Sequence, residues 1–190
     1  TEVDAEFLKE IEEWRILLAR NIALRNFRPS AGSAVASEAP SAGSVTSCPL
    51  GIASEAKQSQ SKTEATQTPN LHRAERQLNY AVQTTIDRIL FLRICEDRQI
   101  EPTDQLLQVA EGSDIYAKLL LLFQKADQKY NSGLFHFSKE KGQTSDPDTF
   151  TPSLQIDDKV LRQIIKSTYF PCPYMFNEIP VEILGQVYEQ

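Results

Sequence analysis

The chain has 190 residues, and its 26 Asp and Glu outnumber its 20 Lys and Arg, which gives a formal net charge of −6 at pH 7. This acidic balance argues against a basic protein that coats nucleic acid without selectivity, although a local basic stripe could still contact DNA. No run of apolar residues approaches the roughly 20 that a membrane-spanning helix needs.

The cysteines indicate a reducing compartment. Cys48, Cys95 and Cys172 lie far apart, show no Cys-x-x-Cys spacing and have only His72 and His136 as further candidate ligands. The sequence therefore predicts neither a disulfide framework nor a zinc site, and a cytoplasmic location fits best. The first residues include no initiator Met and no basic signal-peptide region, and we expect a piece of a longer polypeptide.

The first segment, residues 4–27, has the pattern of a long amphipathic helix, and Asp4 can cap its N-terminus. Its apolar residues recur at helical spacing. They are Phe7, Leu8, Ile11, Trp14, Leu17, Leu18, Ile22 and Leu24. The charged residues between them have both signs, so we expect that face to be solvated or paired with neighbouring helices.

Residues 28–70 differ abruptly from the segments on either side. They contain no aromatic residue and few large aliphatic residues, and they are rich in Ser, Ala, Thr, Gln, Gly and Pro. Such a stretch cannot bury enough apolar area to offset the entropy lost on ordering it. We therefore predict a low-complexity, disordered insertion in a surface connection between two helices.

The segment that organises the chain is residues 78–98. Its apolar residues follow one helical face at first and then spread around the circumference, which is typical of a helix in the middle of a bundle. The first face comprises Leu78, Val82, Ile86, Ile89 and Leu92, and the extension comprises Leu90, Phe91, Ile94 and Cys95.

Two arginines lie within the apolar half of this central helix. A buried guanidinium must be paired or face a ligand, because burying an uncompensated charge is very costly. Nearby carboxylates are available: Glu96 and Asp97 follow Arg93 by three and four residues, and Asp87 adjoins Arg88. We therefore expect local ion pairs.

The rest of the chain has further helical patterns. A short helix is expected at residues 104–110, a strongly apolar one at 115–130 and another at 157–167. Residues 134–156 have apolar patches at both ends and read as a loop pinned at each end. A last helix begins near Pro180, a residue that suits a first helical turn.

These elements predict an all-α fold with roughly six helices in an irregular or orthogonal bundle. Residues 1–27 would supply its N-terminal helix, residues 28–70 the insertion and residues 71–190 the remaining helices.

Most catalytic motifs are missing from the sequence. The seven glycines never form a Gly-x-Gly, so neither a dinucleotide loop, a glycine-rich methyl-donor loop nor a Walker loop is encoded. Nucleophile elbows and His-Glu-x-x-His helices are absent as well. No catalytic residue, cofactor-binding residue or metal ligand is therefore predicted.

One arrangement of acidic residues formally matches a nuclease pattern. Pro147-Asp148 followed by Asp157-Asp158-Lys159 has the order in which many metal-dependent nucleases place their magnesium carboxylates and assisting lysine. The pattern is degenerate, and the nuclease core needs strands that are scarce here. We favour a simpler interpretation, in which both aspartates stabilise a helix N-terminus and the lysine begins its exposed face.

A second short motif faintly resembles the Asn-Pro-Pro-Tyr loop of adenine methyltransferases. It is Pro171-Cys172-Pro173-Tyr174, which lacks the first-position amide that would accept hydrogen bonds from the target amino group. We do not assign it that role.

Several blocks, in order, resemble a known family. They are EFLKEIEEWRILLARNIALRN, LNYAVQTTIDRILFLRICEDRQIE, YNSGLFHF, TPSLQIDDKVLRQIIKSTYF and IPVEILGQVYEQ. The chain outside residues 28–70 is similar to the helical region that precedes the methyltransferase core in large type II restriction-modification enzymes, which fuse an endonuclease to an N6-adenine DNA methyltransferase. The insertion is a departure from the family pattern.

The resemblance implies a noncatalytic helical connector. Residues 71–190 would end where a methyltransferase core begins, and a nuclease domain would precede residue 1 in many relatives. Partners would then be those two domains of the same polypeptide and double-stranded DNA, with no membrane. S-adenosylmethionine and Mg²⁺ are expected for the parent enzyme, and neither for this fragment.

Contact with DNA would use basic side chains directed at phosphates rather than at bases. The candidates are Arg88, Arg93, Arg98, Lys125 and Lys129, each of which could instead be an ion-pair or surface residue. An autonomous helical module that binds a partner helix or peptide is the alternative from another class. A nuclease in its own right is a third, which a magnesium-dependent cleavage assay would test.

Overall fold

A computed structural model of the chain describes residues 2–27, 64–130, 133–138 and 146–176. Within these ranges it contains helices and no strand, in the order α1 (Glu2–Asn26), α2 (Glu64–Asp97), α3 (Gln105–Glu111), α4 (Ile115–Tyr130), the 3-10 helix η1 (Thr151–Ser153) and α5 (Asp158–Ser167). The predicted all-α class is confirmed. The helix expected near Pro180 lies outside the described residues, as does most of the predicted insertion.

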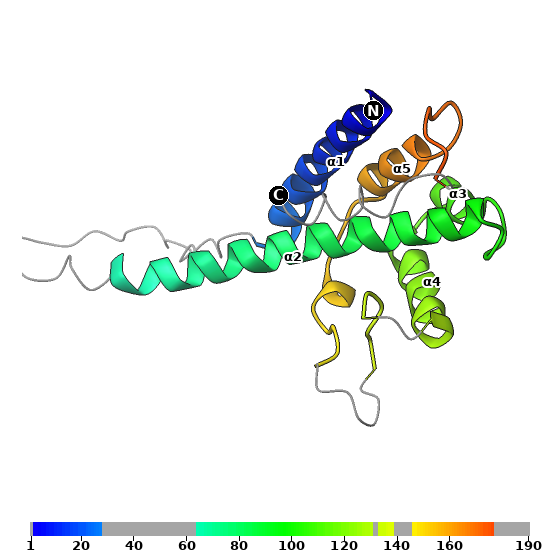
Figure 1. Ribbon diagram of the computed structural model, residues 1–190. Coiled ribbons are helices and arrows are strands. Elements are labelled where there is room, and N and C mark those ends of the chain that lie inside the picture. Colours follow the sequence, from blue (N-terminus) through cyan, green and yellow to red (C-terminus); the bar gives the residue numbers. More distant parts are fainter. Residues whose placement is uncertain (1, 28–63, 131–132, 139–145, 177–190) are drawn as a thin grey trace, which may run out of the picture.

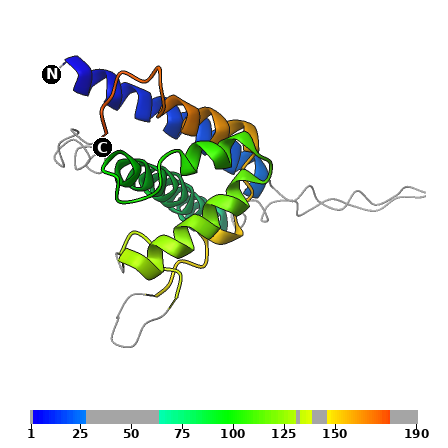
Figure 2. The ribbon, with the colours of Figure 1, turned by 90° about the vertical axis from the view of Figure 1, so that its right-hand side faces the viewer.

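The long helix α2 is the axis of an irregular bundle. In Figure 1, α1 and α5 lie on one side of α2 and α4 projects from the other side, with α3 near the C-terminal end of α2. The view along α2 in Figure 2 confirms that α1 and α5 run side by side. The N-terminal turns of α2 extend beyond the other helices.

The core forms where the apolar faces of the helices meet α2. On α1 the buried residues are spaced by three and four positions, and they are Phe7, Ile11, Trp14, Leu18 and Ile22. Leu24, which the pattern also placed on the apolar face, is instead 67% exposed. On α2 nearly every side chain from residue 81 to 90 is buried, as expected for a central helix.

The start of α2 differs from the prediction. The helix begins at Glu64, whereas the sequence pattern extended the insertion to Asn70. Residues 64–70 are polar and include Pro69, so they carry no apolar periodicity that would indicate a helix. The next residues of α2, 71–80, are largely exposed, so no core contact imposes an apolar pattern on their sequence.

Paired asparagines join α1 to the segment before α5. The Asn26 amide nitrogen donates to the Gln155 carbonyl oxygen at 2.9 Å, and its oxygen accepts from the Gln155 N–H at 2.8 Å. Asn21 exchanges an equivalent pair of bonds with Asp157, to the carboxylate at 2.8 Å and from the N–H at 2.9 Å. These four bonds fix the start of α5 against α1.

No helix in the described part of the chain combines the length and apolarity needed to cross a membrane.

Candidate functional site: charged networks and a cleft on the central helix

The first charged network surrounds Arg88 in the middle of α2. The side chains of Arg88 and Asp148 are 2% and 4% exposed, and Nη2 lies 2.8 Å from Oδ2. Nη1 donates to Thr151 Oγ1 at 2.7 Å, and Nε donates to the Leu134 carbonyl oxygen at 2.9 Å. The guanidinium also stacks over Phe137, with its central carbon 4.5 Å from the ring centroid. Every edge of the guanidinium is therefore engaged.

The same network holds Asp148 in its charged form. Oδ1 accepts from the backbone N–H groups of Phe150 and Thr151 at 3.1 and 3.0 Å. Burial alone would raise the pKa of Asp148, but hydrogen bonds from Thr151 and Arg88 and the Arg88 charge outweigh burial, so the pKa lies below its ordinary value. Arg88 thus holds both ends of the loop that the sequence predicted to be pinned.

The partner of Arg88 is not the expected one. We expected Asp87, its neighbour in sequence, but successive residues on a helix point in different directions. The Asp87 carboxylate instead accepts from Gln83 Nε2 at 2.9 Å. Asp148 lies 60 positions away in sequence, and no local spacing could have identified it.

The second network lies at the C-terminal end of α2, and here the predicted pairing is confirmed. Arg93 Nη1 forms an ion pair with Asp97 and lies 3.9 Å from Glu96 Oε2. Arg93 Nε donates to the Thr168 carbonyl oxygen at 3.0 Å, and its guanidinium stacks on Tyr169 at 4.3 Å from the ring centroid. Arg93 thereby attaches the end of α5 to α2.

The two carboxylates of this Arg93 network each hold a further segment. Glu96 Oε1 accepts from the Leu106 N–H at 2.9 Å, which satisfies a free donor in the first turn of α3, and Oε2 accepts from the Tyr169 hydroxyl. Asp97 Oδ2 accepts from the Phe176 N–H at 3.2 Å. Burial raises the pKa of Glu96, although the hydrogen bonds from Tyr169 and Leu106 and the Arg93 charge oppose the rise.

The residues of the nuclease-like pattern are separated by their roles. Asp148 is the partner of Arg88, whereas Asp157 bonds to Asn21 and forms a 2.7 Å ion pair with Arg25. Asp157 is the N-cap residue of α5 and Asp158 lies in the first turn, as the simpler interpretation expected, but the Asp157 side chain makes no capping bond there. Among the described residues, no group of three or more His, Cys, Asp or Glu could hold a metal ion.

Asp158 has a role that the sequence did not indicate. Its two carboxylate oxygens accept from the N–H groups of Asp114 and Ile115, each at 2.9 Å, so it caps α4 rather than its own helix. Arg162 caps the C-terminal end of α3. Its guanidinium donates to the carbonyl oxygens of Ala110 and Gly112, each at 2.8 Å. Helix periodicity identifies the faces of α5 but not these partners.

The remaining basic candidates lie on the surface. Arg98 and Lys125 are exposed, and Lys129 is exposed while its Nζ lies 2.6 Å from Glu101 Oε1 in the turn after α2. The five predicted DNA-contact residues therefore divide into the interior arginines, Arg88 and Arg93, and three surface cations.

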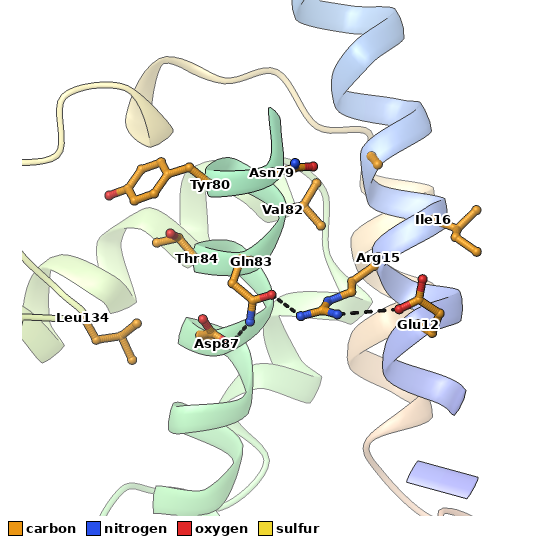
Figure 3. Close-up of a pocket in the computed structure, with 11 residues that line it drawn as sticks. Glu12, Arg15, Ile16, Asn79, Tyr80, Val82, Gln83, Thr84, Asp87 and Leu134 are labelled. Atoms are coloured by element: carbon orange, nitrogen blue, oxygen red, sulfur yellow. Dashed lines mark hydrogen bonds and ion pairs between the residues drawn. The ribbon is translucent and has the colours of Figure 1, made fainter. Parts of the chain in front are cut away.

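A cleft of about 850 Å³ separates α1 from α2. Figure 3 shows a polar chain across it, in which Glu12 pairs with Arg15, Arg15 donates to Gln83 and Gln83 donates to Asp87. Apolar groups from both helices and from Leu134 complete the lining. The lining is thus amphipathic, with charged and hydroxyl side chains beside apolar ones.

Comparison with known proteins finds a relative of this chain. The chain is 29% identical over 196 aligned residues to the type II restriction enzyme and methyltransferase RM.Eco57I of Escherichia coli, and the alignment covers 98% of the chain. The chain thus resembles part of a restriction-modification enzyme. The resemblance found in the sequence blocks is confirmed, and this chain spans 13% of the length of RM.Eco57I. No family model and no solved structure matches the chain.

Proposed function

We propose that the chain is a noncatalytic helical connector of a restriction-modification enzyme, which docks against a methyltransferase core and couples it to a nuclease domain and to bound DNA in the cytoplasm. The observation that carries the proposal is the similarity to RM.Eco57I over nearly the whole chain, at only 13% of that protein's length. A unit of this size within a long polypeptide has to connect to its other parts.

The two charged networks support a mechanical role. Arg88 fastens Leu134, Asp148 and Thr151 to α2, and the Arg93 network fastens α3, α5 and the segment that follows α5. The charged groups of each network form ion pairs and hydrogen bonds within the protein. We infer that the networks define the relative positions of chain segments rather than bind a substrate.

The cofactors of the parent enzyme would bind elsewhere. S-adenosylmethionine and Mg²⁺ are expected for a methyltransferase and a nuclease, but the described residues fit neither. The sequence has no Gly-x-Gly loop, and the aspartates of the nuclease-like pattern are engaged with Arg88, Arg25 and the first turn of α4. We therefore place the methyl-donor site and the cleavage site of the parent enzyme outside the described residues.

Contact with DNA, in this proposal, falls to the surface cations. Arg98, Lys125 and Lys129 can reach a phosphate from the side of α2 and α4, and Lys129 would exchange Glu101 for it. Arg88 would first have to leave a buried ion pair and Arg93 a partly buried one, a cost that a phosphate contact does not offset. Their part in DNA binding is therefore indirect.

Hydrogen exchange tests docking in the intact enzyme. The backbone amides of peptides from α1 and α5 should exchange more slowly in the full-length polypeptide than in the 190-residue chain. Residues 81–90, in the interior of α2, serve as the unchanged reference. Equal exchange in both proteins would contradict the connector. The isolated chain should not cleave DNA with Mg²⁺, and cleavage that is lost in Asp157→Ala would establish a nuclease instead.

An autonomous interaction module is the second candidate, and the cleft between α1 and α2 is the observation that favours it. Two helices flanking an amphipathic groove can accept a partner helix or peptide. The reading frame distinguishes the two functions, because a methyl-donor loop and an Asn-Pro-Pro-aromatic motif downstream of residue 190 support the connector, and a natural stop there supports the module.

A further inference from the structure

The segment after α5 turns a row of apolar side chains outward. Figure 1 shows this segment, in orange, looping away from the end of α5. Phe170 is 96% exposed and Met175 is 64% exposed, and Pro171 and Pro173 between them are exposed as well. We call these four side chains the 170–175 ridge.

Alternate residues of the same segment point inward and are packed. Phe176 is fully buried, and Tyr174 is partly buried against the core. Both rings contact Phe7 of α1, with centroids 4.9 Å apart for Tyr174 and 5.8 Å apart for Phe176. The outward and inward positions alternate as in an extended strand, so the packed rings determine which side chains face solvent.

The Arg93 network fixes both ends of the ridge. Arg93 holds the Thr168 carbonyl oxygen and the Tyr169 ring before it, and Asp97 accepts from the Phe176 N–H after it. The two prolines restrict the backbone between these anchors. The ridge is thus held on both sides by contacts with α2, which preorganise its exposed side chains.

Exposure of large apolar side chains is unfavourable in water. Covering large apolar side chains is favourable, and exposed apolar side chains grouped on one segment commonly mark interaction sites. The ridge is already ordered in the folded chain. A partner that covers it would therefore bury apolar surface with little further loss of conformational entropy.

We propose that the 170–175 ridge inserts into an apolar pocket of the methyltransferase core of the same polypeptide, with Phe170 as the central anchor. The inference rests on the proposed connector function, and it names the surface through which the connector docks. Phe170 is suited to this role because aromatic side chains that fill a pocket dominate the energetics of small interfaces.

The size of the ridge favours a partner in the same polypeptide over a second copy of the chain. Stable association of separate proteins buries about 1,200–2,000 Å² in total, far more than four side chains offer. A tethered partner needs much less, because covalent linkage sets an effective concentration of about millimolar. RM.Eco57I, of which this chain matches 13%, has its two named activities in one polypeptide, which provides such a tether.

Oxidation of Met175 tests the occupant directly, because it is the single methionine of the chain. Hydrogen peroxide should convert it to the sulfoxide rapidly in the 190-residue chain and at least about tenfold more slowly in the full-length polypeptide, as measured by peptide mass spectrometry. Equal rates would overturn the docking inference. Protection in the 190-residue chain that increases with its concentration would assign the ridge to a second copy and overturn the proposed occupant.

Phe170→Ser identifies the anchor, and Leu121→Ser is a matched control because Leu121 is 58% exposed on α4. Both variants should lower the melting temperature of the 190-residue chain only slightly, since both side chains are largely exposed and Leu121→Ser adds a small loss of helix propensity. In the full-length polypeptide, Phe170→Ser should restore rapid Met175 oxidation and Leu121→Ser should not.

The two proposals fail in distinguishable ways. If the outer faces of α1 and α5 are protected in the full-length polypeptide while Met175 oxidises at the rate seen in the 190-residue chain, the connector stands and the ridge is not its docking surface. If none of these surfaces is protected, both proposals are wrong. Continued protection of Met175 in Phe170→Ser would remove Phe170 as the anchor.

Discussion

Arg88 is the side chain on which the interior of the molecule depends most. It is among the largest fully buried side chains, and its guanidinium contacts both ends of the loop between α4 and α5. A charge in such a place stabilises the fold only through its partners, because each partner would otherwise be a buried polar group without a bond.

Replacing Arg88 by Met should therefore be costly. The change leaves the buried Asp148 carboxylate without its counter-ion, and we expect the free energy of unfolding to fall by about 3–5 kcal/mol in urea titrations. Adding Asp148→Asn should recover part of the loss, since the two residues are coupled. Arg98→Met, at an exposed position directly after α2, should change stability by less than about 0.5 kcal/mol. A similar small effect for Arg88→Met would contradict the network.

Asp148 and Glu96 should contribute to the pH dependence of stability with opposite signs. The pKa of Asp148 in the folded state lies below its ordinary value of 3.8, so the unfolded chain binds more protons in that window and stability is lost as pH falls through it. The pKa of Glu96 lies above 4.5, so stability decreases as pH rises from that value to the raised pKa.

Urea titrations at stepped pH can separate the two carboxyl groups. Asp148→Asn should flatten the acid limb below pH 3.8, and Glu96→Gln should flatten the decline above pH 4.5. Parallel curves for both variants and the parent chain would show that neither group has a shifted pKa in the folded state.

Sequence reasoning identified residues whose partners are near in the chain. The Arg93 pairs with Glu96 and Asp97 follow from helix geometry, because side chains three and four positions apart share a face. In the sequence, Asp148 belongs only to the nuclease-like pattern, because nothing local relates it to Arg88. The apolar residues around Arg88 in the sequence indicate that it is buried and needs a partner. The tertiary fold decides which residue that partner is.

At the scale of elements, helices in this molecule complete one another's termini. Glu96 of α2 caps α3, Asp158 of α5 caps α4, and Arg162 of α5 bonds the last carbonyl oxygens of α3. The short helix α3 has no side-chain cap of its own. Its stability therefore depends on α2 and α5 rather than on its intrinsic propensity.

Asp158→Ala should destabilise the chain through α4. Loss of the acceptor for the Asp114 and Ile115 N–H groups should cost about 0.5–2 kcal/mol, the range for removal of a helix cap, and should accelerate amide exchange in the first turn of α4. Lys159→Ala, the next position and an exposed one, is the matched control and should have no measurable effect. An effect of Asp158→Ala confined to α5 would show that it caps its own helix.

The helices themselves were largely predictable because burial imposes apolar periodicity. The buried residues of α4 and α5 repeat every three or four positions, and the predicted bounds of α4 agree with the structure. The N-terminal turns of α2 were missed for the complementary reason. Residues 71–80 are largely exposed, and residues 64–70 carry no apolar periodicity, so only the structure reveals that the helix starts at Glu64.

The whole molecule presents different surfaces to its proposed partners. The 170–175 ridge is an apolar surface at one end of the bundle, and the surface cations lie on and beside α4. The exposed turns of α1 carry several glutamates, including Glu6, Glu12 and Glu13, which would repel DNA phosphates. A polypeptide docked through the ridge would thus leave the side with α4 open to a duplex.

Removal of a surface cation should weaken DNA binding by the full-length polypeptide in a salt-dependent way. If Lys125 contacts a phosphate, Lys125→Ala should reduce the slope of log K against log salt concentration by about 1, with no change in sequence preference. Lys166→Ala on α5 supplies the control, because Lys166 is exposed on a different helix. An unaltered slope for Lys125→Ala would remove Lys125 from the DNA surface.

The length of α2 gives the bundle a mechanical property. The helix has 34 residues, and the turns from Glu64 to Leu78, about 20 Å long at 1.5 Å per residue, reach past the other helices (Figure 1). Because a helix bends little over this distance, we expect these turns to rotate as one rigid body with the buried half of α2. A tilt of about 10° in that half carries Glu64 through about 4 Å. Small reorientations of the core would thus become large displacements of whatever chain is attached at the tip.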